Sequence, residues 1–263
     1  MKTSVILEAL NLRPDELSLS RRNAVRGAGR FSTALALAAV PLGLGGSARK
    51  AFAASAGLSV TDVLNYALTL EYLEDEFYRK GLAASGLIPG EDRTVFETIS
   101  AHETIHVAYL KNALGGDAVK KPEFDFTAGG KFPTFEDYGI FQALAQGFED
   151  TGVRAYKGQF GNLQSNPSVL TAAATIHSVE ARHASEVRRL RGQKGWITRS
   201  QTDVPALAAV YAGEGRTDQA GVSLLDASTV GNDRETLVNA ITEAFDESLN
   251  RGDVLAIAGQ FLA

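Results

Sequence analysis

The sequence predicts an all-α protein, a four-helix bundle with a long crossover between its second and third helices and a C-terminal helical extension. Three observations predict this fold. Apolar residues recur at helical spacing in four segments between residues 59 and 193. No segment alternates apolar and polar residues with comparable strength, as strands would. The first and third segments, and the second and fourth, are related by a shift of 78 or 77 residues, which indicates an internal repeat.

The first two helices have recognisable ends. The first occupies residues 59–84, where Ser59 or Thr61 can accept hydrogen bonds from amides of the opening turn. The second begins after Pro89-Gly90 and stops at Gly115-Gly116, since glycine is favoured just beyond the end of a helix.

The connection after the second helix is too long for a tight turn. It covers residues 117–136 and contains Gly129-Gly130, which suits a crossover between distant helix ends. Thr134 is the expected cap of the third helix, and Asn166-Pro167 starts the fourth. Residues 54–193 therefore form the expected bundle.

The C-terminal part, residues 194–263, is predicted to consist of loops and short helices. Residues 234–250 are amphipathic, and residues 253–263 are apolar enough to dock on other helices. We expect both segments to pack on the bundle. A contact between the subunits of a homo-oligomer is the alternative.

Residues 1–53 are similar to a signal segment for twin-arginine (Tat) export. Arg21-Arg22 precedes a weakly apolar run, and Ala51-Phe52-Ala53 has the small-residue pattern of a cleavage site. This pattern predicts export through the Tat pathway to the periplasm or another extracytoplasmic space. The alternative is an N-terminal arm with a chance pair of arginines. Because the apolar run is short and contains Pro41, no stable membrane span is expected.

The composition excludes several kinds of site. The chain has no cysteine, which rules out disulfides, iron–sulfur clusters, thiolate zinc sites and cysteine nucleophiles. Without residues 1–53 it has 18 basic and 28 acidic residues, a balance that does not suit nucleic acid binding. Only four histidines are present, and all fall in two short stretches.

The first histidine stretch matches the zinc-peptidase motif H-E-x-x-H. On a helix, His102 and His106 would lie one turn apart as zinc ligands, with Glu103 as general base. The extended form of the motif is missing, because Tyr109 and Asn112 stand at its glycine and histidine positions. A distant glutamate could supply the third ligand, so a zinc metallopeptidase stays open as a remote alternative.

A shorter pattern within the same letters is duplicated. Glu103-x-x-His106 recurs as Glu180-x-x-His183, and each pair interrupts an otherwise apolar helix face. A glutamate on the preceding helix stands 32 residues before the first pair and 31 before the second. The duplicated set consists of Glu71, Glu103, His106, Glu149, Glu180 and His183.

Four carboxylates that face a bundle core need partners. Each would cost on the order of several kcal/mol unless it were paired or protonated, and two divalent cations would remove that cost. One glutamate from each of two helices, with Glu-x-x-His from each of the other two, is a dinuclear arrangement of bundle proteins. Carboxylate-rich sites with one imidazole per metal suit iron or manganese. The sequence therefore predicts two iron or two manganese ions.

Neighbouring residues offer alternatives and additions to this set. Glu74 and Asp75 could replace Glu71, but Gly152 stands where the repeat would match Glu74, which favours Glu71. Further residues could support the ligands by hydrogen bonding, although core packing is the plainer interpretation for the tyrosines and partial exposure for the histidine. These are Tyr78, Tyr156 and His177.

Residues 59–193 resemble the ferritin-like superfamily of di-iron and di-manganese carboxylate proteins. More narrowly, the chain is similar to a ferritin-like domain family that includes desiccation-related proteins. The resemblance rests on ALTLEYLEDEFY, HETIHVAYL, GFEDTGVRAYKG, HSVEARHASEVR and EAFDESL. It implies a four-helix bundle with a long crossover, in which the six residues of the duplicated set are the metal ligands.

The expected chemistry is redox, with a small oxidant such as peroxide or O2. Oxidation of ferrous ion and removal of peroxide both suit a dinuclear centre, as in ferroxidases and manganese catalases. Whether the protein is an enzyme stays open. The alternative of another class is a non-catalytic stress or desiccation-related bundle whose metal is structural or absent.

Overall fold

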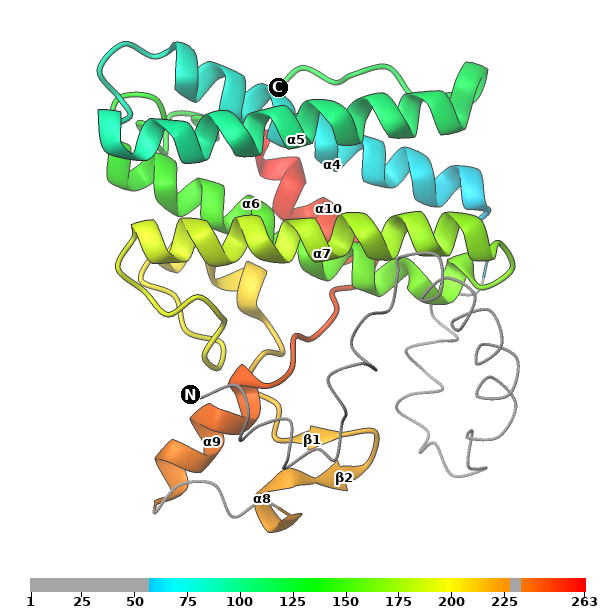
Figure 1. The fold of residues 1–263 in the computed structure, drawn as a ribbon, viewed down its shortest axis with the longest axis vertical. Coiled ribbons are helices and arrows are strands. Elements are labelled where there is room, and N and C mark those ends of the chain that lie inside the picture. The colour runs from blue at the N-terminus through cyan, green and yellow to red at the C-terminus, as the bar shows by residue number, and fades with distance from the viewer. Residues whose placement is uncertain (1–56, 228–232) are drawn as a thin grey trace, which may run out of the picture. The chain divides into compact units, whose positions relative to one another are not determined.

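Four long helices form a bundle, and the all-α class predicted from the sequence is confirmed (Figure 1). The helices are α4 (Val60–Ala83), α5 (Gly90–Leu114), α6 (Tyr138–Gln159) and α7 (Pro167–Leu190). The structure, a computed structural model, describes residues 57–227 and 233–263. Packing is most extensive between α4 and α5 and between α6 and α7. In Figure 1, α5 and α7 lie on the near side of the bundle, with α4 and α6 behind them.

Local sequence signals set most ends of these helices. The Ser59 side chain accepts a hydrogen bond from the Asp62 amide, and the Asp62 carboxylate accepts one from the Ser59 amide, forming a capping box. The Asn166 side chain caps α7, ahead of Pro167 at its first position. The second helix ends at Gly115, whose φ of 56° lies in the left-handed region that glycine tolerates.

The predicted cap of the third helix is wrong. It is Asp137 that caps α6, because its side chain accepts a hydrogen bond from the Ile140 amide. Thr134 instead donates its buried hydroxyl to the Phe126 carbonyl at 2.6 Å. The threonine lies within the crossover, too far before the helix to reach the free amides of the first turn.

The crossover runs back along the bundle, because α5 and α6 point in the same direction (Figure 1). It begins with the short helix η2 (Gly115–Asp117) and is tied to the end of the chain. The Asp125 amide donates to the Phe261 carbonyl at 2.8 Å. The Ala263 amide donates to the Glu123 carbonyl at 3.0 Å. These bonds hold the crossover and the C-terminus against each other.

Short elements complete the described part of the chain. They are η3 (Phe160–Leu163), η4 (Pro205–Tyr211), β1 (Asp218–Gln219), β2 (Val222–Ser223), α8 (Leu224–Ala227), α9 (Arg234–Glu243), α10 (Arg251–Ala258) and η5 (Gly259–Phe261). The two strands pair antiparallel and form a small hairpin, which the helical pattern of the sequence did not predict. Both η4 and α10 pack on α6.

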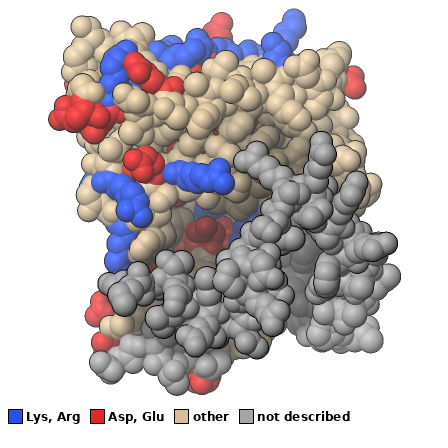
Figure 2. Space-filling view, viewed as in Figure 1, with Lys and Arg blue, Asp and Glu red and all other residues tan. Residues whose placement is uncertain are grey.

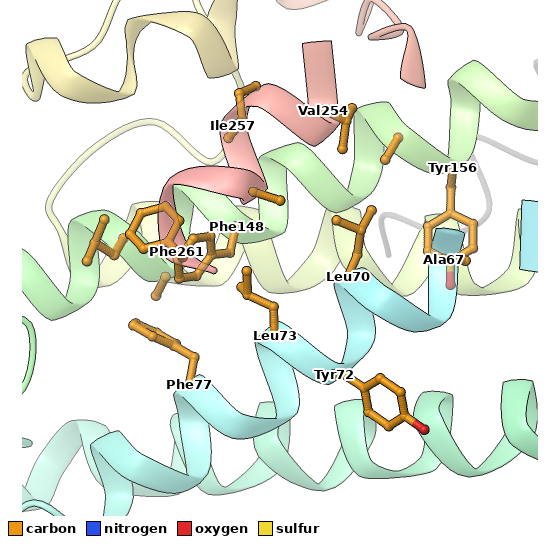
Figure 3. Packing of buried hydrophobic residues seen from close by; sticks show 14 of the residues in the cluster. Ala67, Leu70, Tyr72, Leu73, Phe77, Phe148, Tyr156, Val254, Ile257 and Phe261 are labelled. Carbon is orange, nitrogen blue, oxygen red and sulfur yellow. The ribbon is translucent and has the colours of Figure 1, made fainter. Parts of the chain in front are cut away.

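The last two helical elements, α10 and η5, cover the face of the bundle formed by α4 and α6. Figure 3 shows Phe261 beside Phe148 of α6, and Ile257 lines the same small space as Leu70 of α4 and Phe148. The rings of Phe148 and Phe261 meet edge to face, with centroids 4.9 Å apart. The apolar core therefore extends continuously from the bundle into the end of the chain.

A buried arginine fastens the loops after α7 to α6. The Arg154 side chain is fully buried, and its Nε lies 2.8 Å from Glu214 Oε1. Its guanidinium donates to the Ala212 carbonyl at 2.5 Å and to the Glu247 carbonyl at 2.8 Å. It also donates to the Val210 carbonyl. Most of its donors are therefore satisfied by groups of the chain itself.

A second buried ion pair stands beside the first. Arg188 of α7 pairs with Asp150 of α6, and Asp150 also accepts a hydrogen bond from the Tyr211 hydroxyl at 2.8 Å. The two pairs are called the arginine cluster below: Asp150, Arg154, Arg188 and Glu214. They connect two bundle helices to the segment that follows them.

The predicted signal segment, residues 1–53, lies outside the described residues. Across the described ranges, every helix is too short or too polar for a membrane crossing.

Candidate metal centre

Each helix of the bundle contributes one fully buried glutamate to the interior. Their side chains have no solvent-exposed surface, and they are Glu71 (α4), Glu103 (α5), Glu149 (α6) and Glu180 (α7). All four stand on the inward, otherwise apolar face of their helix, as the seam pattern predicted. The bundle geometry thus brings together four carboxylates from distant parts of the sequence.

Two histidines complete the cluster, and both direct Nδ1 toward the carboxylates. His106 Nδ1 lies 3.2 Å from Glu71 Oε2, 3.0 Å from Glu103 Oε2 and 3.1 Å from Glu180 Oε1. His183 Nδ1 lies 2.9 Å from Glu103 Oε1. A carboxylate oxygen of α6 stands 3.1 Å from the same nitrogen. Both imidazoles are buried, so these contacts are shielded from solvent.

The six side chains form two overlapping groups that can each hold a metal ion. In each group, one ligand atom per residue lies within 4.8 Å of the others. One group is Glu71, Glu103, His106 and Glu180, and the other is Glu103, Glu149, Glu180 and His183. Glu103 and Glu180 belong to both, so the arrangement has two positions that share two carboxylates. The six residues singled out from the sequence are therefore brought together in space.

The shared carboxylates are short of partners. Glu103 Oε1 and both carboxylate oxygens of Glu180 are buried without a hydrogen-bond partner among the described residues, although imidazole nitrogens approach them. Buried oxygens of this kind cost free energy unless a donor or a cation meets them. A cation would satisfy them, and a site rich in carboxylates with one imidazole at each position fits iron or manganese.

The protonation of the cluster reflects its excess of acid. Burial, with the charge of Glu180, raises the pKa of Glu103 well above its usual range, and burial raises that of Glu149 to about 8. Burial acts on Glu180 too, but contacts with the two imidazoles outweigh it and bring its pKa to about 2. Burial alone would lower the pKa of His183, yet the surrounding carboxylates raise it to about 12. These raised pKa values favour the protonated forms of Glu103, Glu149 and His183, which reduces the negative charge of the cluster when no cation is bound.

Two tyrosines support the cluster across the bundle. Tyr78 of α4 donates its hydroxyl to Glu149 of α6 at 2.5 Å. Tyr156 of α6 donates to Glu71 of α4, also at 2.5 Å. Burial and the adjacent carboxylates raise the pKa of both phenols well above their usual range, so they remain donors. The internal repeat is therefore also a crossed pair of hydrogen bonds, which adds to the packing role expected from the sequence.

Glu74 approaches the cluster without joining either group of candidate ligands. It is buried next to Gly152, where an added Cβ atom would lie 3.3 Å from Glu74 Oε1 and 3.6 Å from Glu180 Cγ. Burial and the neighbouring carboxylates raise its pKa well above the usual range. Asp75, the other alternative ligand, is occupied elsewhere by hydrogen bonds from Arg79 and from a threonine of α5.

The other two histidines play different parts. His102 belongs to neither metal group, but its Nδ1 lies 2.9 Å from His183 Nε2. Burial, with the charge of His183, lowers the pKa of His102, so it can accept that hydrogen bond as a neutral ring. His177 contacts the Val153 carbonyl at 2.9 Å instead of a ligand. The sequence offered no signal for the contact between His102 and His183.

A cavity of about 270 Å³ opens over the centre between α5 and α7. It is lined by His102, Ile105, His106, Val179, Arg182 and His183. On the opposite side, where Glu74 meets α10, the remaining space is only about 10 Å³. Figure 2 shows that uncharged residues cover much of the near face of α5, with charged side chains toward its edges. The centre is therefore approached from the side of α5 and α7.

Comparison with known families agrees with this architecture. The model of a family described as a ferritin-like domain matches residues 59–193, which make up half of the chain. The chain belongs to the ferritin-like domain family. All six clustered residues and both supporting tyrosines lie within the ferritin-like domain, whereas α9 and α10 follow it. Comparison with curated proteins finds no match.

Proposed function

We propose that this ferritin-like protein binds a dinuclear iron or manganese centre and uses it in redox chemistry. The observation that carries the proposal is the set of buried, unpartnered oxygens on Glu103 and Glu180, the two carboxylates shared by both groups. The residues that would hold the ions are Glu71, Glu103, His106, Glu149, Glu180 and His183. When bound, two such ions would supply electron transfer for the oxidation of ferrous ion or the removal of peroxide.

The chain's own residues would prepare the site for that chemistry. Tyr78 and Tyr156 orient the terminal glutamates, because each hydroxyl donates to one carboxylate oxygen and leaves the other oxygen directed inward. The aromatic residues packed around Phe77 exclude water beside the centre, with the Phe77 and Phe141 rings stacked at 4.7 Å. A preorganised, dry ligand set needs little rearrangement when charge changes.

The size of the approach restricts the substrate. The cavity between α5 and α7 has room for small solutes, while the face covered by α10 is closed. Ferrous ion, peroxide and O2 are small enough to reach the carboxylates by this route. A polymeric substrate, as a peptidase would require, fits a cavity of about 270 Å³ poorly.

Turnover tests the redox proposal. Protein loaded with iron or manganese is expected to oxidise ferrous ion or consume peroxide faster than the same amount of free metal. Glu180→Gln should abolish the excess rate, whereas Glu97→Gln, an exposed glutamate of α5, should retain it. Rates equal to those of free metal would contradict an enzymatic function.

One feature also favours a structural role for the metal. Each of the two candidate metal groups draws its ligands from three different helices, and together the two groups connect all four helices. A bound cation would therefore hold the bundle together without any turnover, as in the non-catalytic, stress-related alternative. In that case chelation would lower the melting temperature while catalytic assays stayed at the level of free metal.

Export is a separate proposal that rests on residues 1–53. Their paired arginines and small-residue pattern support transport through the Tat pathway to an extracytoplasmic space. Fusing this segment to a reporter tests it. Replacement of Arg21 and Arg22 by lysine should retain the reporter in the cytoplasm, and unchanged export would refute the assignment.

A further inference from the structure

His102 breaks the internal repeat of the ferritin-like domain. The residue before Glu103 is a histidine, whereas the residue before Glu180 is Val179. The two halves of the centre are otherwise matched in carboxylates, imidazoles and supporting tyrosines. A difference at this single position bears on only one of the two imidazoles.

The imidazole concerned is that of His183. Its Nδ1 faces the carboxylates, and its Nε2 lies 2.9 Å from His102 Nδ1. The two rings are stacked, with centroids 5.2 Å apart and planes inclined by 16°. Both nitrogens of His183 are thus engaged, and the ring is held from two sides.

The imidazole of His106 has no such support. Its Nδ1 faces the carboxylates in the same way. Its Nε2 has no hydrogen-bond partner in residues 57–227 or 233–263, and the His106 side chain lines the cavity between α5 and α7. At the matching position on α7, the side chain of Val179 has no atom that can accept a hydrogen bond.

We propose that His102 is a positioning residue that makes the two metal positions unequal. By accepting a hydrogen bond from His183 Nε2, it fixes the tautomer and the orientation in which His183 presents Nδ1. The position of Glu149 and His183 therefore binds its ion more tightly than that of Glu71 and His106. An acceptor behind a ligating histidine typically changes metal affinity by about 10- to 100-fold. This inference rests on the dinuclear centre proposed above.

Titration of the metal-free protein with Mn2+ alone, followed by calorimetry, tests the inference. The unmodified protein should bind two equivalents in two separate steps. His102→Ala should weaken one step by about 10- to 100-fold and leave the other unchanged. His102→Gln should recover much of the loss, because its amide oxygen can accept the hydrogen bond. Val179→Ala, at the matching position of α7, should alter neither step.

Double variants identify the position that is affected. In a His106→Ala background, where the position of His183 remains, adding His102→Ala should weaken Mn2+ binding by the same factor. In a His183→Ala background it should have no effect, because the residue that His102 positions is gone. Melting curves of the metal-free variants would verify that each one folds.

Other results would overturn the inference. Two Mn2+ equivalents with affinities unchanged by His102→Ala would show that His102 does not position His183, while leaving the dinuclear centre intact. Loss of one equivalent to the same extent as in His106→Ala would make His102 a direct ligand, as in the zinc-peptidase arrangement. Fewer than two equivalents in the unmodified protein would overturn the dinuclear centre and this inference together.

Discussion

The candidate metal centre and the arginine cluster are both buried and charged, yet they balance their charges differently. In the arginine cluster, Arg154 and Arg188 face Glu214 and Asp150, so the number of positive and negative groups is equal. The metal centre has four fully buried glutamates and only two imidazoles. Even with both imidazoles protonated, its fully ionised carboxylates would leave a negative charge.

The difference separates a cluster that the chain itself neutralises from one that can hold a cation. Neighbouring residues of α6 illustrate it, since Glu149 points into the bundle while Asp150 meets Arg188 and Tyr211. The arginine cluster is neutralised by the chain itself and holds the segment that follows α7 against the bundle. The metal centre keeps an excess of unpartnered carboxylate oxygens and can therefore hold an external cation. Removing charge should accordingly have opposite effects in the two places.

The largest effect is expected in the arginine cluster. Arg154→Met leaves Glu214 buried without its cation and removes the donors to three carbonyls. Breaking a buried ion pair in this way costs about 3–5 kcal/mol. Urea denaturation should show a loss of this size, and limited proteolysis should cut within residues 205–249 first.

Two further variants sharpen this prediction. Arg216→Met removes the ion pairs that this exposed arginine forms with Asp218 and Glu247, so the loss should be below about 1 kcal/mol. Adding Glu214→Gln to Arg154→Met should recover part of the stability, because no buried charge is then left alone. Equal losses for Arg154→Met and Arg216→Met would mean that the buried pair has no special role.

In the metal centre, loss of a carboxylate should not harm the metal-free protein. Glu103→Gln removes a carboxyl whose pKa is raised by burial and by the charge of Glu180. The melting temperature of the metal-free protein should therefore stay equal or rise. The stabilisation by metal should disappear, a loss of about 2.7 kcal/mol at 100 times the dissociation constant. Glu97→Gln on the same helix should keep that stabilisation. A destabilised metal-free Glu103→Gln protein would contradict the assigned excess of acid.

The pH dependence should also reverse on metal binding. Glu149 has a pKa of about 8 in the folded protein, above the 4.5 of an unfolded chain. Between these values the folded state keeps a proton that the unfolded chain has released, so metal-free stability falls as pH rises. A cation must displace this proton, so affinity for Mn2+ should rise over the same window, about tenfold per pH unit and proton. Denaturation and Mn2+ titrations between pH 5 and 8 would measure both slopes; parallel slopes would be inconsistent with proton displacement.

The smallest effect is expected from the supporting tyrosines. Tyr156→Phe removes the donor to Glu71, and Tyr78→Phe removes the donor to Glu149. Each variant should lower the affinity for one of the two Mn2+ ions by about tenfold without abolishing its binding. Tyr66→Phe is the matched control, because its buried hydroxyl has no partner among the described residues. If Tyr66→Phe weakened binding equally, the crossed hydrogen bonds would not be the cause.

The sequence was sufficient for the bundle and for the residues that meet at its centre. Helical spacing set the seams, and the duplicated Glu-x-x-His placed two pairs of side chains on them. The crossed tyrosines were recognised only as candidates, since their bonds depend on how α4 and α6 are rotated against each other. Thr134 was mistaken for a cap because the local sequence does not show where the crossover ends.

The arginine cluster could not be predicted from sequence pattern. Arg154 lies on α6, and its partners follow 56 to 93 residues later, in η4 and in loops, without periodic spacing. Such contacts arise from tertiary packing, for which one sequence carries no local signal. The contact between His102 and His183 is of the same kind, since it joins residues 81 positions apart on different helices.

The number of metal ions bound per chain tests the central claim most directly. Elemental analysis of protein purified from its native compartment should find two iron or manganese ions per chain. Glu180→Gln should reduce this number sharply, and Glu97→Gln should leave it unchanged. Substantially fewer than two ions in the unmodified protein, with no further change in Glu180→Gln, would contradict a dinuclear centre built on the shared carboxylates.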